Sequence, residues 1–300
     1  MKAVQFSRFG APQVLEIVEL PDPHPGAGEI RIRVRAAGIN ASDWKKRQGL
    51  MDRQLPQTLG YEAAGIVDEI GDGARGVAVG DRVFGASPYG AAQAELAVLS
   101  SWAPIPSALD FARAAAIPAA AETAARALDQ LGVTAGSTVL INGASGSVGS
   151  AAVQLAVERG ARVIGTGSAG THDALRSLGT EPVAYGAGMP ERVRAISPSG
   201  VDFALDVAGS GVLPELVELT GAPENVITVA DAVGAQRTGV RFSRGDSGRA
   251  TYALAQVARM AEAGRFAVTV GQTFPLHEVA KAHRVGEAGT VRGKLVLLVE

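Results

Sequence analysis

Residues 139–149 read Val-Leu-Ile-Asn-Gly-Ala-Ser-Gly-Ser-Val-Gly, a run of mostly apolar residues that enters a glycine-rich turn. A helical pattern follows from Ser150 to Glu158, so this stretch predicts a strand, a tight turn and a helix. The first N–H groups of such a helix have no partner within it, and the helix dipole adds positive potential there. The sequence therefore predicts an anion-binding site at the turn.

The spacing of small residues is typical of a dinucleotide-binding turn in all but one position. Gly146 lets the backbone approach a pyrophosphate closely, and Gly149 lets the helix pack tightly on the strand. Ala144 stands where the usual fingerprint has its first glycine, so the motif is Ala-x-Gly-x-x-Gly. Such a motif is a weak signal by itself, and a glycine-rich turn that binds no ligand is the alternative interpretation.

A second apolar strand, 161–167, follows after one helix and completes a β–α–β unit of about 30 residues. In a site that prefers NADH, an acidic residue closes this strand and binds the ribose 2′-hydroxyl. Here the strand ends Gly-Thr-Gly-Ser, and Asp173 comes only later. A neutral end accepts a 2′-phosphate without charge repulsion, so we expect NADPH, with hydrogen bonds from Ser168, His172 and Arg176. His172 and Arg176 are alternatively ordinary solvated helix residues.

Length and composition limit the class of protein. The 300 residues suit two domains of ordinary size, and 47% hydrophobic residues with 38 glycines are typical of a dense α/β protein. The net charge of −2 and the lack of a basic tract argue against a nucleic-acid partner. No apolar run reaches the roughly 18 residues of a membrane span. The first residues resemble a strand and not a signal peptide, so we expect a cytoplasmic protein without a membrane partner.

The chain changes character near residue 110, from β-rich to alternating. Residues 29–35 alternate polar and apolar side chains, as a half-buried strand does. Residues 111–132 predict two short helices joined at Pro118. Strands and helices then alternate, which implies a parallel, doubly wound sheet. The further candidate strands are 2–6, 65–70, 81–84, 138–142, 162–166, 202–206, 226–230, 266–270 and 294–299, with a helix around 276–286.

We therefore expect a dinucleotide-binding domain, 111–265, inserted into a β-rich substrate domain formed by 1–110 and 266–300. Such an insertion leaves a cleft between the two domains, with the ligand across the C-terminal ends of the parallel strands.

Five ordered motifs resemble those of one protein family. They are the stretches 37–45 (Ala-Gly-Ile-Asn-Ala-Ser-Asp-Trp-Lys), 59–67 (Leu-Gly-Tyr-Glu-Ala-Ala-Gly-Ile-Val), 79–85, 142–149 and 282–297. Together they resemble the medium-chain dehydrogenase/reductases, in the zinc-free quinone oxidoreductase branch that includes the zeta-crystallin-like proteins. The resemblance covers essentially the whole chain. It implies an α/β protein, with a Rossmann doubly wound parallel sheet inserted into a β-rich GroES-like substrate domain.

The family also contains zinc alcohol dehydrogenases, so the question of a metal depends on individual residues. Where the zinc branch has a Cys, a His and another Cys, this chain has Asn40, Tyr61 and the stretch 119–121. The chain has no cysteine, which excludes thiolate zinc sites, and its four histidines are scattered. We therefore expect no metal.

Without a Lewis acid, the scaffold still suits reduction of a conjugated carbonyl, in which hydride adds to carbon and charge develops on oxygen. Asn40 and Tyr61 stand at the emptied metal positions and are our candidate catalytic residues. Alternatively, Asn40 is a structural loop residue and Tyr61 is a buried tyrosine with a satisfied hydroxyl. Ser42 and Lys45 are weaker candidates on the same segment. Glu62 resembles a family glutamate, whose expected role here is to tie down a neighbouring loop.

The resemblance implies further cofactor contacts. Thr123 matches a family threonine near the nicotinamide, although Glu122 before it replaces an apolar residue. Tyr185 matches an aromatic residue that approaches the adenosine phosphate, and Lys294 either reaches the phosphates or is a surface lysine. The ends of the strands at 202–206 and 226–230 should line the cofactor. The expected cofactor-binding residues are Thr123, Ser145, Gly146, Ser147, Val148, Gly149, Thr166, Ser168, His172, Tyr185, Val207, Val229 and Lys294.

The leading hypothesis is an NADPH-dependent oxidoreductase that transfers hydride to a quinone or an α,β-unsaturated carbonyl. A biosynthetic enoyl reductase that tailors a polyketide-like intermediate is an alternative within this class. A catalytically silent NADPH-binding protein with a structural or regulatory role is an alternative of another class. The family commonly dimerises through a sheet edge, and residues 238–243 are a plausible edge strand, so we expect a homodimer.

Overall fold

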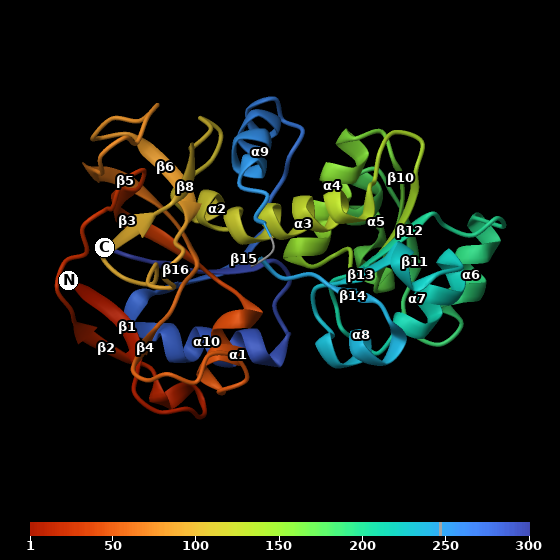
Figure 1. The fold of residues 1–300 in the computed structure, drawn as a ribbon, viewed down its shortest axis with the longest axis horizontal. Helices are drawn as coiled ribbons and strands as arrows, with labels where there is room; N and C mark the ends of the chain where they lie inside the picture. Colours follow the sequence, from red (N-terminus) through yellow and green to blue (C-terminus); the bar gives the residue numbers. More distant parts are fainter. Residues whose placement is uncertain (246–247) are drawn as a thin grey trace. The chain divides into compact units, whose positions relative to one another are not determined.

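The computed structural model describes residues 1–245 and 248–300, which form two compact units. Unit 1 contains Met1–Ala119 and Thr251–Glu300, and unit 2 contains Ala120–Ala250 (Figure 1). Unit 1 is β-rich and unit 2 alternates strands with helices, so the predicted fold class is confirmed. Among the described residues, no helix combines the length and the apolar composition that crossing a membrane requires.

Unit 1 is built from mainly antiparallel strands that come from both ends of the chain. Its strands are β1 (Lys2–Phe6), β2 (Glu16–Glu19), β3 (Ile30–Ile39), β4 (Gln57–Thr58), β5 (Glu62–Ile70), β6 (Arg82–Ala86), β7 (Leu96–Leu99), β8 (Ser101–Pro104), β15 (Val270–Pro275) and β16 (Lys294–Leu298). Its helices are α1 (Ala41–Arg47), α2 (Phe111–Ala115), α9 (Tyr252–Glu262) and α10 (Val279–Ala288). Within the described residues, the larger sheet has the order β15-β16-β3-β5-β6-β8, with β7 also paired to β3. The smaller sheet has the order β2-β1-β4.

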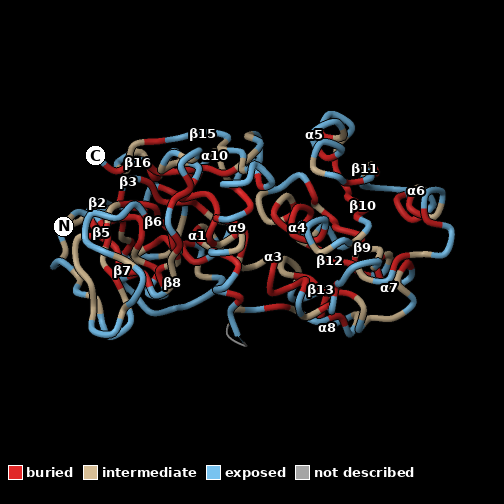
Figure 2. The backbone as a smooth tube through the Cα atoms, turned by 90° about the horizontal axis from the view of Figure 1, so that it is seen from above, coloured by how far each residue is buried: buried red, intermediate tan, exposed pale blue. Residues whose placement is uncertain are grey.

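Strand β3 lies at the centre of unit 1, and its alternating pattern is confirmed. Ile30, Ile32 and Val34 are at most 3% exposed, whereas the arginines between them face outward in part. Figure 2 shows the buried part of the chain following the strands, and the exposed part following the loops between them. Burial of one face of β3 therefore explains the period of two in its sequence.

The units differ from the expected domain limits because α2 and α9 pack in unit 1. Helix α2 contacts β3 and β5, and α9 contacts β8. The Glu262 carboxylate of α9 also accepts hydrogen bonds from the backbone N–H and the hydroxyl of Ser107, at 2.9 and 2.8 Å. Helical periodicity alone does not say which sheet a helix covers, so the sequence did not show that these two helices pack against the strands of unit 1.

Unit 2 contains a parallel sheet. Its elements are α3 (Pro118–Leu131, which begins in unit 1), β9 (Thr138–Asn142), α4 (Ser147–Glu158), β10 (Arg162–Gly167), α5 (His172–Ser177), β11 (Thr180–Ala184), α6 (Met189–Ile196), β12 (Phe203–Asp206), α7 (Leu213–Thr220), β13 (Val226–Thr228), α8 (Ala232–Thr238) and β14 (Arg241–Phe242). Within the described residues, its strand order is β11-β10-β9-β12-β13-β14, and β14 forms one edge as predicted. The chain runs outward from β9 in one direction and then, from β12, in the other. The C-terminal end of β9 is therefore the topological switch point, where ligands bind in sheets of this kind.

Several predicted elements have different limits in the structure, and two of these differences concern the glycine turn and β15. Helix α4 begins at Ser147 and not at Ser150, so it starts inside the glycine turn. The strand predicted for 266–270 is wrong, because β15 begins at Val270 and extends to Pro275. Pairing of Val270 with Lys294 and of Pro275 with Leu298 sets these limits. The apolar residues before Val270 are not part of the strand.

Candidate functional site

The glycine turn of unit 2 follows β9 directly, and Gly146 is the N-cap of α4. Gly146 has φ −77° and ψ 171° and contributes no side-chain cap to the helix. A Cβ placed on Gly146 would meet one atom within 4 Å, the carbonyl oxygen of Gly143 at 3.4 Å. The first N–H groups of α4 have no partner within the helix. The turn is thus an exposed cradle for an anion, which a side chain at position 146 would fill.

Close packing behind the turn explains the other small residues. A Cβ on Gly149 would lie 2.2 Å from the carbonyl oxygen of Gly143, so a larger residue would displace α4 from the turn. Ala144, the departure from the usual fingerprint, is fully buried. Strand β10 makes room for its methyl group with Gly165, where a Cβ would come within 2.7 Å of the Ala144 Cβ. A glycine on the next strand therefore compensates for the missing glycine of the motif.

A row of buried polar side chains crosses the C-terminal ends of four neighbouring strands. The Thr166 hydroxyl of β10 donates to Asn142 Oδ1 of β9 at 2.7 Å, and Asn142 Nδ2 donates to Asp206 Oδ1 of β12 at 2.9 Å. The Thr228 hydroxyl of β13 donates to Asp206 Oδ2 at 2.7 Å. The sheet register sets Asp206 opposite both Asn142 and Thr228. We call these four residues the strand-end network.

The strand-end network also holds the backbone of the turns that follow β9 and β12. The Gly143 N–H donates to Thr166 Oγ1 at 2.9 Å, and the N–H groups of Ala208 and Gly209 each donate to Asp206 Oδ1 at 3.0 Å. The hydroxyl of Thr166, a predicted cofactor residue, thus donates to Asn142 and accepts the Gly143 N–H. It therefore also positions the glycine turn.

The same arrangement ends β13. The N–H groups of Ala230 and Asp231 both donate to Thr228 Oγ1 at 3.1 Å, so the chain turns after Thr228 and not at residue 230 as predicted. Val207 and Val229 each follow a member of the strand-end network and are partly exposed at this edge of the sheet. The network therefore brings these two predicted cofactor residues to the edge that carries the glycine turn.

Ser168 and Tyr185 follow the ends of two neighbouring parallel strands. Strands β10 and β11 pair as far as Gly167 and Ala184, so the next residues stand side by side at the same edge of the sheet. Tyr185 is 63% exposed, and Ser168 is partly buried. This pair can supply a hydroxyl and an aromatic ring to one ligand group.

The basic residues near this edge differ in what they bind. Arg176 Nη1 pairs with Asp173 at 2.7 Å on the exposed face of α5, which is the solvated alternative stated for it. His172 begins α5, and its Nε2 is buried without a hydrogen-bond partner among the described residues. The Arg192 guanidinium, which the sequence did not single out, donates to carbonyl oxygens of residues 184–187. It fixes the loop after β11, and its position on α6 gave no local signal of this role.

Thr123 lies partly buried in α3 beside Glu122, the acidic residue that departs from the family pattern. The Glu122 carboxylate accepts hydrogen bonds from Arg126 Nε at 2.8 Å and from the Ala250 N–H at 3.2 Å. Arg126 in turn donates to the Ser243 hydroxyl. Glu122 thus anchors later segments of unit 2 to α3, next to the predicted nicotinamide contact.

In unit 1, the buried side chains of Glu62 and Lys294 form an ionic cluster with the partly buried Asn40. Lys294 Nζ lies 2.5 Å from Glu62 Oε1 and 2.5 Å from Asn40 Oδ1. Asn40 Nδ2 donates to Glu62 Oε1 at 2.8 Å, and Glu62 Oε2 accepts the Ala119 N–H at 2.7 Å. Glu62 therefore ties down a neighbouring segment, as expected. The surface alternative for Lys294 is wrong, because its side chain is 4% exposed and its ammonium group binds Glu62 and Asn40.

Asp43 fixes the backbone of Asn40. Asp43 Oδ2 accepts the Asn40 N–H at 2.7 Å and Gln93 Nε2 at 3.3 Å, and Oδ1 accepts the Gly60 N–H at 3.4 Å. Burial raises the pKa of Asp43 to about 6. Asn40 is structural through its backbone, which begins α1, while its side chain belongs to the ionic cluster.

Tyr61 lies directly before Glu62 in the chain, and its ring contacts a lysine. Lys46 Nζ lies 5.6 Å from the centre of the Tyr61 ring and donates to the Thr58 carbonyl oxygen at 3.2 Å. Burial lowers the pKa of Lys46. The structure thus joins Asn40 to Glu62 and Lys294, and pairs Tyr61 with a partly desolvated cation.

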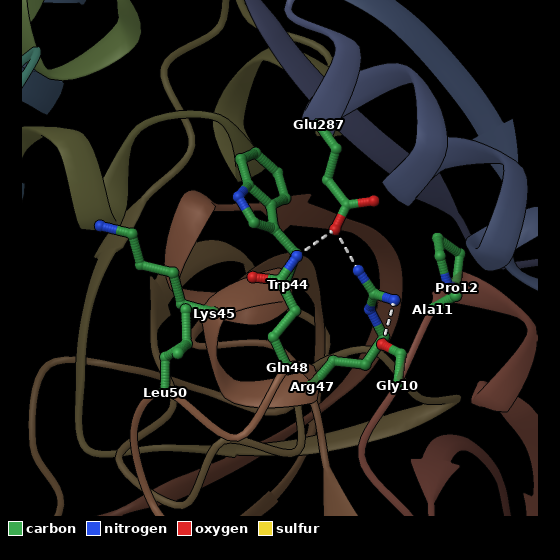
Figure 3. A pocket seen from close by; sticks show the side chains of 9 residues that line it. All are labelled: Gly10, Ala11, Pro12, Trp44, Lys45, Arg47, Gln48, Leu50 and Glu287. Atoms are coloured by element: carbon green, nitrogen blue, oxygen red, sulfur yellow. Dashed lines mark hydrogen bonds and ion pairs between the residues drawn. The ribbon is translucent and has the colours of Figure 1, made fainter.

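A cavity of about 530 Å³ lies elsewhere in unit 1, beside α1 and α10. Trp44 and Lys45 line it, and Figure 3 shows Arg47 directed toward Glu287 at its wall. Arg47 is buried and also donates to the Gly10 carbonyl oxygen at 2.6 Å. The ion pair across this cavity is a structural link between α1 and α10. Lys45 is the sequence candidate that borders the cavity.

Two protein families match parts of the chain. Residues 26–102 match the alcohol dehydrogenase GroES-like domain, and residues 178–297 match the zinc-binding dehydrogenase family.

Individual relatives cover nearly the whole chain. Human quinone oxidoreductase is 31% identical over 328 residues, which cover 100% of this chain and 98% of the relative. The spectinabilin polyketide synthase system protein NorB of Streptomyces orinoci is 33% identical over 307 residues, which cover 96% of this chain but 14% of that protein. The chain thus spans a small part of NorB.

Solved structures are similar over the same length. The quinone oxidoreductase from Coxiella burnetii has a TM-score of 0.85 at 30% identity, covering 100% of this chain and 99% of the other. A mycobacterial protein complexed with NADPH also has a TM-score of 0.85, at 28% identity and 99% coverage of both chains.

Proposed function

The chain belongs to the medium-chain dehydrogenase/reductase superfamily, in its quinone oxidoreductase branch, and from this membership we propose an NADPH-dependent reductase of quinones or α,β-unsaturated carbonyls that uses no metal. Membership makes the chain an NAD(P)-dependent oxidoreductase, and the choice of cofactor and acceptor belongs to the proposal. The observation that carries it is the ionic cluster, in which the amide of Asn40, at the position of a metal ligand, binds the ammonium group of Lys294. The proposal includes a homodimer joined at the sheet edge formed by β14.

The glycine turn fits a dinucleotide. Position 146 is an exposed cradle, and the N–H groups of Ser147, Val148 and Gly149 begin a helix of 12 residues. They would hold the pyrophosphate, and Ser168, His172 and Tyr185 would hold the 2′-phosphate. When bound, NADPH supplies the hydride that adds to the electrophilic carbon of the acceptor. The similar mycobacterial structure holds NADPH, which supports this choice.

We expect NADPH to bind at least about tenfold more tightly than NADH, the effect of one hydrogen bond of about 1.5 kcal/mol to a charged group. Ser168→Asp places a carboxylate at the end of β10 and should reverse the preference, whereas Ser168→Asn, equal in size and neutral, should not. Fluorescence titration with each nucleotide measures the ratio of Kd values. Equal affinity of the unaltered protein for both nucleotides would contradict the assignment of this strand end.

A zinc ion does not fit the residues at the corresponding positions. Asn40 Oδ1 stands at one of these positions and Glu62 Oε1 lies beside it, and Lys294 Nζ lies 2.5 Å from each oxygen. A divalent ion on either oxygen would meet this ammonium group at close range, with strong repulsion in a buried site. The described part of the chain also has no group of three His, Cys, Asp or Glu residues placed to hold a metal. The proposal therefore assigns no step to a metal ion and leaves stabilisation of the substrate oxygen to side chains.

Asn40 stabilises the charge that the reaction creates. As the acceptor carbon gains hydride, negative charge grows on its carbonyl oxygen, giving an enolate or a hydroquinone anion. One hydrogen of Asn40 Nδ2 binds Glu62, and the second donates to this oxygen. The Tyr61 hydroxyl then donates the proton that completes the reduction and regains a proton from solvent. The Lys46 ammonium group, 5.6 Å from the centre of the Tyr61 ring, stabilises the phenolate formed between these two steps.

We expect NADPH oxidation with 9,10-phenanthrenequinone or an enone as acceptor. Asn40→Ala should lower kcat by about 10²- to 10³-fold, the usual loss when one donor to a developing oxyanion is removed. NADPH affinity, measured by titration, should stay unchanged and serves as the control for folding. Tight NADPH binding without turnover of any acceptor would contradict the proposal and favour the catalytically silent protein.

A second candidate is an enoyl reductase with a dedicated, polyketide-like substrate. The similarity to NorB favours it. The same residues would act, because an enoyl thioester is also a conjugated carbonyl. A kcat/KM for an enoyl thioester more than about tenfold above that for quinones, a difference of about 1.4 kcal/mol in transition-state binding, would favour this candidate.

A further inference from the structure

The backbone register of unit 1 brings the ionic cluster together. Leu295 of β16 pairs with Ile39 of β3, so the preceding residue, Lys294, comes next to Asn40. On the other side of β3, Ala63 pairs with Ala37, which sets Glu62 beside Gly38. A Cβ at Gly38 would lie 2.3 Å from Glu62 Oε1, so the glycine leaves room for the carboxylate. Three strands therefore deliver one cation, one amide and one carboxylate to the same place.

The partners of Asn40 determine which way its amide faces. An ammonium group has donors and no acceptor, and an ionised carboxylate has acceptors and no donor. The atom beside Lys294 must therefore be Oδ1, and the atom beside Glu62 must be Nδ2. A flipped amide would set donor against donor and acceptor against acceptor. Asn40 thus offers a ligand the second hydrogen of Nδ2, which suits a carbonyl oxygen that gains negative charge.

The buried charge also strengthens this donor. Lys294 is 4% exposed and Glu62 is fully buried, so little water screens the ammonium group. A cation on Oδ1 draws electron density from the amide, and linked hydrogen bonds polarise one another. Glu62 on Nδ2 opposes this effect, but Lys294 and the Ala119 N–H together neutralise much of its charge.

We infer that Lys294 is a positioning residue for the reduction: its ammonium group orients and polarises the Asn40 amide, and so acts on the substrate oxygen through Asn40. The inference rests on the proposed function, because it concerns the same carbonyl group. A fixed side-chain cation thus acts on the oxygen through Asn40, whereas a Lewis acid would bind the oxygen directly.

The kinetic test separates polarisation from simple charge neutralisation. Lys294→Met alone leaves Glu62 buried without its cation, so that variant has two defects. The double variant Lys294→Met/Glu62→Gln removes both charges at nearly constant size, and Lys294→Arg keeps the cation. We expect the double variant to lose about 10- to 100-fold in kcat with little change in KM, and the Arg variant to keep most of its activity. NADPH titration of each variant reports whether it is folded.

A direct readout needs no turnover. The carbonyl stretching frequency of bound 9,10-phenanthrenequinone, measured by infrared difference spectroscopy without NADPH, reports the polarisation of that carbonyl. We expect the carbonyl frequency to be lower than in free quinone when the quinone is bound to the unaltered protein or to Lys294→Arg. In the double variant this lowering should be lost. If the carbonyl frequency in the double variant equals that in the unaltered protein, the inference is overturned even if kcat falls, because the role of Lys294 is then structural. If the unaltered protein reduces the quinone and the double variant does so with the same kcat, the inference fails but the proposed function stands. Failure of the unaltered protein to reduce any acceptor would instead refute the proposed function.

Discussion

Gly146→Asp is expected to abolish nicotinamide-cofactor binding without destabilising the protein. Gly146 has φ −77°, which any residue adopts, and a Cβ there has its nearest neighbour at 3.4 Å. Aspartate is a preferred N-cap, worth about 1 kcal/mol to a helix. Its carboxylate would occupy the anion cradle, and a like charge in contact with the pyrophosphate costs several kcal/mol. A loss of about 4 kcal/mol weakens binding about 10³-fold.

Two measurements on the Gly146 variants check this expectation. NADPH titration should show the loss of binding, and thermal unfolding without cofactor should show an equal or higher Tm. Gly146→Asn has the same size and capping ability without the charge, so the difference between the two variants isolates the electrostatic part. If the Kd of Gly146→Asp for NADPH is less than about tenfold above that of the unaltered protein, the pyrophosphate does not lie at this turn.

The order of elements was predictable from the sequence because local periodicity carries it. The alternation in β3 follows from burial of Ile30 and Ile32, and the glycine turn marks the end of β9. The predicted bounds of elements differ from the structure where strand pairing or packing against a distant segment sets them. The strand β15 ends where β16 ends, and α9 belongs to unit 1 because Glu262 binds Ser107. Neither fact leaves a mark in the periodicity of the segment concerned.

The candidate site shows the same division. Asn40 and Tyr61 were found because they stand inside motifs, but their partners come from distant strands. Lys294 is 254 positions from Asn40, and it was expected at the surface or at a phosphate. The sequence around Lys294 does not distinguish it from any other lysine at the start of a strand, because its partners Asn40 and Glu62 lie far away in the chain. Arg192 likewise binds carbonyl oxygens of another loop, and hydrogen bonds to backbone leave no trace in the residue types of that loop.

Asp206→Ala is expected to cause the largest loss of stability. Asp206 is fully buried and accepts hydrogen bonds from Asn142, Thr228 and the N–H groups of residues 208 and 209. Alanine would leave these donors without an acceptor, away from water. Each buried unsatisfied donor costs about 1 to 3 kcal/mol, and partial relaxation suggests a total of about 3 to 5 kcal/mol. In a unit of this size, that loss lowers Tm by roughly 10 to 20 °C.

Asp206→Asn separates the shape of this side chain from its capacity to accept. The amide oxygen can still serve Asn142 and the turn after β12, but the new NH₂ group would face Thr228 Oγ1. The Thr228 oxygen already accepts the N–H groups of Ala230 and Asp231, so the new NH₂ group would be a third donor facing it. The Thr228 hydroxyl hydrogen would also lose its acceptor, Asp206 Oδ2. We expect Asp206→Asn to lower the free energy of unfolding by about 1 to 2 kcal/mol, which is less than the loss in Asp206→Ala. Both variants should also weaken NADPH binding, because the strand-end network holds the turns that carry the cofactor residues. If thermal unfolding places Asp206→Ala within about 1 kcal/mol of the unaltered protein, buried hydrogen bonds across the strand ends do not hold this sheet edge together.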